Sequence, residues 1–450
     1  MRGALVHRVT MARRFALILS LLLVTVAAGA CRQAPDFDDR LSVIVRPYRF
    51  SILRWQLDQL FGRSGSEPAA EALHVGDGTD SELVLEYFSL ISRMRALQRE
   101  INAITLGSQS GDLDALTAEL ERLQSAASSL RQPVQRVMGG QIREALSAQG
   151  IHNPLDRHIR LRFGFPPLNF RLDQPPNLLV ISPRDRIESI REVMLVQDLN
   201  VDQFERIEAQ VDALGVSSMV TELGGFGGTY PTFVAADATL PWTLSTATEE
   251  WLHQYLAFTP LGFTYLLDSI GVARDYEVAT MNETLAGMVS DEVAAIVLDE
   301  FYPQYGYPQR PGTGGEATFD FNRTMRELRL AVDELLASGE IERAEQLMEE
   351  RRQFLVSKGY YIRKLNQAYF AFYGTYADEP TSVSPIGAEM RELRRRSTSL
   401  REFLNTAAGM TGRKDLVDAL EAPQEQDLLA RTVGDSQRGL FPVLEPTASG

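Results

Sequence analysis

The sequence predicts an α+β fold that is predominantly α-helical, and three observations support this prediction. Residues 87–130 carry apolar side chains three and four positions apart, which is the spacing of a helix face. Between residues 159 and 235, short apolar or alternating runs are bounded by proline and glycine, as strands usually are. From residue 244 to residue 408 the apolar spacing is again helical almost throughout.

The N-terminus has the pattern of an export signal. Four arginines precede an apolar run over residues 15–28, and the run is followed by Gly29-Ala30-Cys31. Because the single cysteine stands at the expected cleavage point, the segment resembles a bacterial lipoprotein signal, although Ala28 stands where such signals usually have Leu. The resemblance implies removal of residues 1–30 and lipidation of Cys31. The protein would then be anchored on the extracytoplasmic side of a bacterial membrane, in the cell envelope. The alternative is an ordinary signal peptide with an incidental cysteine.

The charge of the chain argues against nucleic acid as a partner. The formal net charge is −15, and it becomes −19 when residues 1–30, which contain four arginines and no acidic residue, are removed. Such an acidic surface repels phosphate backbones, and the sequence contains no basic stripe. Cys31 is the single cysteine, so the chain cannot form an internal disulfide. Burial of apolar side chains must therefore stabilise the mature protein.

Residues 31–80 are expected to form a linker or tether, and residues 81–150 an antiparallel helical hairpin. Two apolar stripes flank a Gly-Ser turn at residues 107–111, and Pro133 is expected to end or kink the second helix. The hairpin is either an arm that binds a partner or a subdomain packed on the body. The stripes consist of Tyr87, Leu90, Met94, Leu97, Ile101 and Ile104, followed by Leu113, Leu116, Leu120, Leu123, Ala127 and Leu130.

Residues 151–310 are expected to form an α+β domain. A helix at 201–214 opens with Asn200 as its cap, and the glycine run at 224–228 is interpreted as a hairpin turn. That run lacks the Lys-Ser/Thr of a phosphate-binding loop. The predicted strands are 159–163, 177–182, 216–223 and 229–235.

The rest of the chain is predicted to be helical. Residues 311–421 are expected to form a C-terminal helical subdomain, which follows a Pro/Gly loop at 308–316, and residues 422–450 a flexible tail. The predicted helices are 244–258, 260–270, 281–300, 319–336, 341–356, 360–376 and 390–408.

Glu249 and His253 are candidate metal ligands. They are four residues apart on a predicted helix and therefore on one face, where two side chains can bind one ion. Glu250 lies one step round this helix, and Glu283 would come from the next long apolar helix. Asn282 and Glu283 interrupt an apolar run, so they need a polar partner if they are buried. The simpler alternative is an ion pair between Glu249 and His253, with the acids near a helix start.

Two short motifs around these residues resemble the gluzincin metallopeptidases. Residues 248–256 read Thr-Glu-Glu-Trp-Leu-His-Gln-Tyr-Leu, and residues 280–286 read Thr-Met-Asn-Glu-Thr-Leu-Ala. Gluzincins carry His-Glu-x-x-His on one helix and Asn-Glu-x-x-Ala on a second, so here Glu249 replaces the first His. The resemblance implies a zincin-like domain with a small mixed sheet before the active-site helix. Its edge strand, at residues 229–234, would hold extended substrate through Thr229, Tyr230 and Thr232.

The resemblance also implies a divalent metal cofactor, which we expect to be zinc. Glu249, His253 and Glu283 can still coordinate zinc, but two carboxylates and one imidazole neutralise the ion. A less positive ion activates water less, and the oxygen-rich set would also suit Mn²⁺. A second departure from the family is Gly287, because thermolysin-like enzymes have an Asp there that supports a histidine.

The implied chemistry is hydrolysis of a peptide or protein substrate. Glu250 would be the general base, and a tyrosine would stabilise the oxyanion. Tyr369 is the candidate, because it would share a face with Tyr376 on the helix predicted at 360–376. The alternative is that these tyrosines form an aromatic core face.

Three functions remain open from the sequence. The first is a membrane-anchored metallopeptidase, whose activity the Glu249 replacement could reduce. The second is a catalytically inactive zincin-fold lipoprotein that binds a partner, and the third is a helical lipoprotein with a structural role in the envelope.

Overall fold

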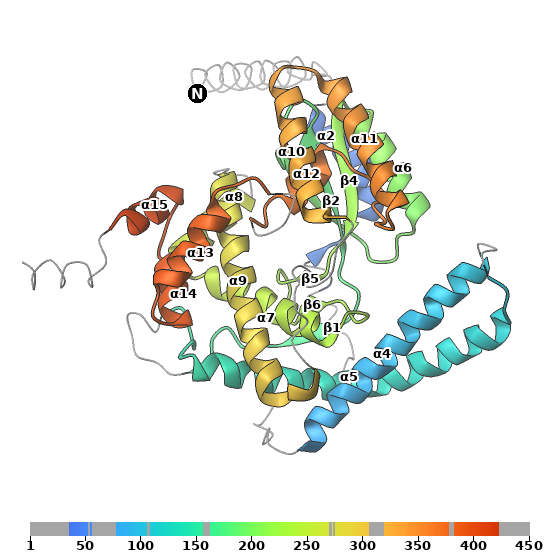
Figure 1. Ribbon diagram of the computed structural model, residues 1–450, viewed down its shortest axis with the longest axis vertical. Coiled ribbons are helices and arrows are strands. Elements are labelled where there is room, and N and C mark those ends of the chain that lie inside the picture. The colour runs from blue at the N-terminus through green and yellow to red at the C-terminus, as the bar shows by residue number, and fades with distance from the viewer. Residues whose placement is uncertain are drawn as a thin grey trace, which may run out of the picture.

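The structure, a computed structural model, places most of the chain but not its ends. The signal segment, Cys31 and the tail from residue 423 lie outside the described residues, as do the predicted loop at 308–316 and all but the last residue of the strand predicted at 159–163. The linker expected at 31–80 is described only in part, and there it is not a simple tether, because residues 37–48 are helical and bury Leu41 and Val45. The described residues form two lobes, each with a three-stranded sheet and several helices (Figure 1), which confirms a predominantly helical α+β fold. The described residues are 36–52, 55, 78–105, 109–155, 163–269, 272, 275–305, 319–377 and 382–422.

The first lobe is built on an antiparallel sheet whose strand order is β3-β2-β4. Its central strand is β2, an apolar run that is buried on both faces because side chains alternate along a strand. Leu179 and Ile181 pack against helices on one face, and Leu178 and Val180 pack against a helix on the other. The strands are β2 (Asn177–Pro183), β3 (Arg191–Leu195) and β4 (Val216–Glu222).

Helices cover both faces of this sheet. The first face carries α2 and α6, and α6 begins with the expected cap, since the Asn200 side chain accepts from the Gln203 amide. The second face carries α12, over which α10 and α11 pack. These helices are α2 (Phe37–Val45), which runs into the 3₁₀ turn η1 (Arg46–Tyr48), α6 (Val201–Asp212), α10 (Phe321–Ala337), α11 (Ile341–Ser357) and α12 (Gln367–Tyr373).

The single helix predicted at residues 360–376 is wrong, because only α12 is helical in that range. Gly359 has a φ of 90° and ends α11, and the side chain of Asn366 then caps α12. The residues between are held in a non-helical path by ion pairs to α6. Arg363 donates to the Glu208 carboxylate at 2.5 and 2.9 Å, and the Lys364 ammonium lies 2.8 Å from Asp212.

The second lobe contains the antiparallel helix pair α7 and α9, beside a mixed sheet of order β1-β6-β5. β6 is central, parallel to β1 and antiparallel to β5, so the prediction that residues 229–234 form a sheet edge is wrong. The predicted hairpin is shifted along the chain, because β4 and β6 belong to different sheets. The glycine run instead supplies the short strand β5, which pairs antiparallel with β6, and Gly227 and Gly228 lie in the turn between the two. These elements are β1 (Phe170–Leu172), β5 (Gly225–Phe226), β6 (Thr232–Val234), α7 (Leu240–Leu256) and α9 (Tyr276–Phe301), which ends in the 3₁₀ turn η2 (Pro303–Tyr305).

Further helices surround α9. The helix predicted at 390–408 is divided in two, because Ser399 caps a new helix by accepting from the Glu402 amide. The helices that pack into the core around α9 are α8 (Pro260–Ser269), α13 (Ile386–Arg396), α14 (Leu400–Ala408) and α15 (Arg413–Glu421). No helix among the described residues is both long enough and apolar enough to cross a membrane.

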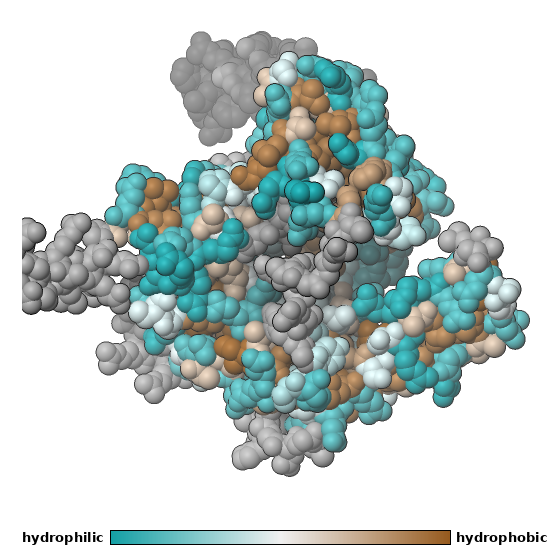
Figure 2. Space-filling view, in the orientation of Figure 1, coloured by the Kyte–Doolittle hydropathy of each residue, from teal (hydrophilic) through white to brown (hydrophobic). Residues whose placement is uncertain are grey.

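The predicted helical hairpin is present as α4 (Gly78–Thr105) and α5 (Leu113–Ala148), which project from the second lobe as an arm (Figure 1). Pro133 lies inside α5 and does not end it. Val134, Met138 and Ile142 after it are completely buried, and this packing outweighs the backbone hydrogen bond that proline removes. Hydrophobic residues are visible along the arm and between α10 and α11 (Figure 2).

The Glu208–Arg363 ion pair generates a first prediction. Arg363→Met should lower the free energy of unfolding by about 2 kcal/mol, because it removes the bidentate partner of the Glu208 carboxylate, whose side chain is 4% exposed, and leaves it only the Lys364 ammonium at 3.4 Å. Urea unfolding followed by circular dichroism would measure this. The matched control is Arg326→Met on α10, an exposed arginine without an ion pair among the described residues. Equal stability of the two variants would contradict the prediction.

Candidate metal centre

The three expected ligands meet where α7 packs against α9. α7 presents Glu249 and His253 on one face, and α9 presents Glu283 opposite them. One ligand atom of each residue lies within 4.8 Å of the other two, and the group is largely buried. Ligands of one zinc ion lie about 2 Å from it and hence within about 4 Å of one another, so a small contraction would close this site around a cation.

His253 is oriented by a second residue of α9. Its Nδ1 lies 3.1 Å from Oδ1 of Asn282, so Nδ1 carries the proton and donates it to the amide oxygen. In the neutral imidazole Nε2 then holds the free lone pair, and in the imidazolium it carries a proton toward the Glu283 carboxylate, one oxygen of which lies 3.5 Å away. Asn282 is 1% exposed and Glu283 is 8% exposed. Asn282 and Glu283, which interrupt an apolar run, therefore share His253 as the polar partner that their burial requires.

Two tyrosines lie against the ligand group. The Tyr265 hydroxyl, from α8, donates to Oε1 of Glu283 at 2.8 Å, and its ring stacks on His253 with centroids 6.3 Å apart. Tyr376 lies in the turn that follows α12. The nearby carboxylate of Glu283, together with burial and Glu249, raises the pKa of Tyr376 well above its usual value. Tyr376 therefore remains a neutral hydrogen-bond donor at physiological pH.

Tyr369, the expected oxyanion donor, occupies a different environment. It lies in α12 and packs on the ring of Tyr373, with centroids 4.5 Å apart, among the apolar side chains of the first lobe. Because α12 ends at Tyr373, Tyr369 and Tyr376 do not share a helix face. Of these two tyrosines, Tyr376 is the one beside the carboxylates. The sequence placed a tyrosine of this segment at the site, but it did not identify which one.

The glycine run at 224–228 packs directly on the candidate base. A Cβ atom on Gly225 would lie 2.2 Å from Oε1 of Glu250, and one on Gly227 would lie 2.8 Å from the Glu250 carbonyl oxygen. The Gly227 backbone also hydrogen-bonds the Glu250 carboxylate. Gln254 donates to the carbonyl oxygens of Gly227 and Thr229 at 3.0 and 2.9 Å. These glycines are therefore needed for close approach of the loop to α7, which the sequence did not reveal.

The expected substrate-binding residues have mixed accessibility. Thr229 and Thr232 are buried, and only Tyr230 exposes its side chain. The edge strands of this sheet are β1 and β5, and β5 contains Gly225, the glycine that contacts Glu250. The exposed edge of this sheet thus lies closer to the candidate base than the strand chosen from the sequence.

The buried acids alter one another's titration. Burial raises the pKa of Glu249 to about 8 and that of Glu250 to about 7, and the neighbouring carboxylates add to this in each case. Burial alone would lower the pKa of His253, but Glu283, Glu250 and Glu249 outweigh it and raise that pKa to about 8. The group therefore holds excess protons near neutral pH, and a bound cation would take their place.

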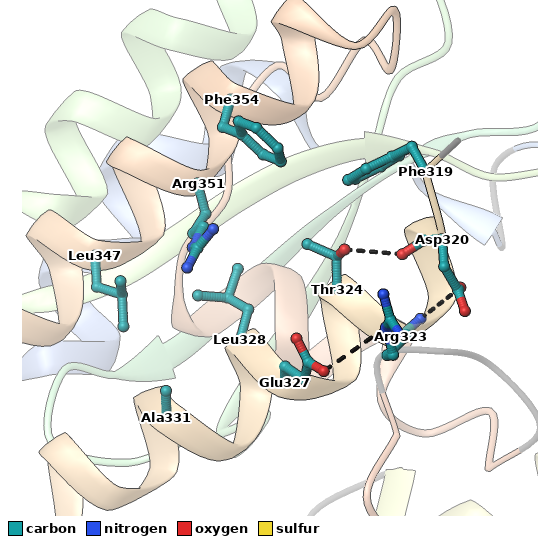
Figure 3. Close-up of a pocket in the computed structure, with 10 residues that line it drawn as sticks. All are labelled: Phe319, Asp320, Arg323, Thr324, Glu327, Leu328, Ala331, Leu347, Arg351 and Phe354. Atoms are coloured by element: carbon teal, nitrogen blue, oxygen red, sulfur yellow. Dashed lines mark hydrogen bonds and ion pairs between the residues drawn. The ribbon is translucent and has the colours of Figure 1, made fainter. Parts of the chain in front are cut away.

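A cavity of about 490 Å³ lies elsewhere, between α10 and α11 (Figure 3). Phe319 and Phe354 face each other at one end with centroids 5.6 Å apart, and Arg323, Glu327 and Arg351 bring both signs of charge to it. The cavity shares no residue with the metal centre. It offers neither a cluster of metal ligands nor a buried base.

Comparison of the chain with protein-family models, with curated proteins and with solved structures finds no match.

The titration of the ligand group predicts that metal binding releases protons. Below pH 8 His253 is cationic and Glu249 is neutral, and both must lose a proton to coordinate. Zinc affinity should therefore rise between pH 6 and pH 8, by up to about 100-fold per pH unit if both protons are lost. Calorimetry in buffers of different ionisation enthalpy would count the protons, and an affinity independent of pH would contradict the prediction.

The glycine contact predicts a separation of metal binding from turnover. Gly225→Ala should displace the Glu250 carboxylate while leaving all three ligands in place, so zinc affinity should persist and any hydrolysis should fall by about 10²-fold or more. Gly287→Ala is the matched control, because a Cβ there meets nothing within 4 Å. Parallel zinc titrations and peptide assays would measure both, and equal loss of turnover in the two variants would contradict the prediction.

Proposed function

We propose that this protein is a metal-dependent peptidase of gluzincin type, held at the outer side of a bacterial membrane by lipidated Cys31. The observation that carries the proposal is the convergence of Glu249, His253 and Glu283 from two packed helices, with Glu250 beside them. The two sequence motifs that resemble gluzincins supply these same four residues. Structural ion pairs rarely gather three buried carboxylates around one imidazole, because each added charge costs free energy without a cation.

Zinc is the ion that fits this donor set best. Imidazole nitrogen and carboxylate oxygen are both zinc ligands, and the group has the size of a first coordination shell. Asn282 gives His253 the tautomer that leaves Nε2 free, as outer-shell partners of zinc-binding histidines do. The second carboxylate, Glu249, also makes Mn²⁺ acceptable, because manganese prefers oxygen.

Glu250 has the properties of a general base. It is not one of the three ligands, and its pKa of about 7 lets it accept a proton and return it to a leaving amine near neutral pH. The Gly227 backbone holds its carboxylate in place. A bound ion would supply the positive charge that polarises the scissile carbonyl and activates the attacking water.

Tyr376 is the best candidate for the oxyanion donor. The Tyr265 hydroxyl is already used by Glu283, whereas Tyr376 approaches the carboxylates from another segment and keeps its proton. The edge of β5 beside Glu250 could pair with the main chain of an extended peptide. Peptide or protein is therefore the proposed substrate class.

The alternative is a catalytically inactive zincin-fold lipoprotein that binds a partner or supports the envelope. Glu249 favours this alternative, because a second carboxylate neutralises the ion and weakens its effect on water. We expect weak activity in the natural chain for the same reason.

Two substitutions test the proposal. Glu250→Gln should lower hydrolysis of a mixed peptide library by about 10²-fold or more and leave zinc affinity unchanged, because it removes a base and no ligand. Glu249→His should raise zinc affinity, because it restores the second imidazole. Glu222→Gln, at an exposed glutamate on β4, is the control and should change neither quantity.

The outcomes separate the candidate functions. Cleavage that survives Glu250→Gln would place the chemistry elsewhere. Zinc binding without any cleavage, in both the natural chain and Glu249→His, would favour the inactive lipoprotein. Absence of zinc binding in both proteins would refute the metal centre itself.

A further inference from the structure

We propose that the corner where α7 turns into α8 is a membrane-contact surface that seats in the interfacial layer of a bilayer. This apolar corner consists of Phe163, Phe165, Phe258, Phe263 and Leu266. The contact itself does not depend on catalysis. Its consequence for substrate choice rests on the proposed function.

The corner exposes large apolar side chains beside one another. Phe258, in the turn between the helices, is 57% exposed, and Phe263, on the first turn of α8, is 58% exposed. Leu266 follows three residues later on the same face of α8 and is 42% exposed. The ring of Phe165 packs against Phe258 with centroids 5.1 Å apart. Exposed apolar groups that gather in this way mark a binding surface.

A second loop is tied to this corner by Asn153. Its side chain donates to the Phe163 carbonyl at 3.2 Å, and its own carbonyl accepts from the Tyr255 hydroxyl of α7 at 3.3 Å. Phe163 is 53% exposed. The loop is therefore fixed against the end of α7, and its phenylalanines extend the apolar surface of α8.

The absence of charge at the corner selects a bilayer as the occupant. The residues of 163–169 and 257–267 that are not buried include no Asp, Glu, Lys or Arg. A bacterial bilayer that carries anionic lipids repels an acidic surface, so an uncharged apolar face is the side that can approach it. Phenylalanine and leucine are also the residues that interfacial segments bury at the headgroup boundary.

The length of the N-terminal tether also favours the bilayer. Only four residues lie between Cys31 and Asp36, the first described residue, so five residue steps join them. A fully extended chain spans at most about 3.6 Å per residue, so lipidated Cys31 would hold Asp36 within about 18 Å of the bilayer. With the body held this close, a bilayer is within reach of its exposed apolar surfaces.

Contact through α8 would bring the metal centre to the membrane surface. Tyr265 lies between Phe263 and Leu266 in the same helix, and its hydroxyl bonds the ligand Glu283 at 2.8 Å. The ligand group is thus separated from the apolar corner by one helix, which has a diameter of about 10 Å. The proposed substrates are therefore peptide segments that lie close to the membrane, such as juxtamembrane stretches of other proteins.

Site-directed fluorescence in vesicles tests the contact. Phe258→Cys and Phe263→Cys would each be labelled with bimane in the full chain. The labelled proteins would be reconstituted in phosphatidylethanolamine–phosphatidylglycerol vesicles with or without brominated acyl chains. The parent chain, whose one cysteine is Cys31, is the labelling blank. Leu330→Cys on α10, 54% exposed and outside the corner, is the matched control, and Leu266→Cys replaces either variant that fails to fold.

We expect brominated lipid to quench the labels at residues 258 and 263 by about twofold or more and to leave the label at 330 unchanged. Equal quenching at all three positions, or none at 258 and 263, would overturn the proposal. Shielding of the two labels from aqueous iodide without lipid quenching, together with a doubled molecular mass, would assign the corner to a second copy and also overturn it.

The readout requires neither metal nor turnover, so it is independent of the proposed peptidase activity; only the tether argument rests on the proposed lipidation of Cys31. Quenching in a protein that binds no zinc would leave the membrane contact intact and remove only the peptidase. Zinc binding and peptide cleavage without quenching would leave the peptidase intact and remove only the membrane contact.

Discussion

The packing of α7 against α9 fixes the position of every group in the metal centre. Two polar contacts set the register of the two helices. Ser245 donates to Asp291 at 2.8 Å at one end of the crossing, and His253 meets Asn282 at 3.1 Å at the other. The contacts are eight residues apart on α7 and nine on α9, as an antiparallel pair requires. A slip of one residue in this register would rotate Glu283 by about 100° and remove it from His253.

Burial of so many acids at this crossing has an energetic consequence. Glu249, Glu250 and Glu283 face one imidazole, and the raised pKa values of Glu249 and Glu250 show that their charged forms are disfavoured there. A fold does not gain stability from such a group. The rest of α7 and α9 compensates with a buried apolar cluster and with threonine and serine side chains that are themselves hydrogen-bonded, as Thr243, Thr248 and Ser290 are. The acids therefore occupy a packed setting that a cation could stabilise.

The sequence predicted the ligand group by two routes. Four-residue spacing put Glu249 and His253 on one helix face, which is a local property, whereas Glu283 on a second helix was chosen through the resemblance of residues 280–286 to the second gluzincin motif. The misassigned features depend on contacts that are distant in the chain. Arg363 reaches Glu208, 155 residues away, and this contact breaks the helix that would have put Tyr369 and Tyr376 on one face. Likewise, Gly225 could not be linked to Glu250 before α7 was seen beside β5. The strand at 229–234 has the pattern of any short strand, and only its two neighbours make it central.

α5 is continuous over 36 residues, which corresponds to about 54 Å. Its first half lies in the arm, and near its other end Gln141 accepts from the Tyr302 hydroxyl, just beyond α9, at 2.6 Å. No loop interrupts this helix, so Pro133, which removes one backbone hydrogen bond, is the position where it should bend most easily. A displacement of the tip of the arm would therefore be transmitted along one continuous helix to the residue that holds the base of α9.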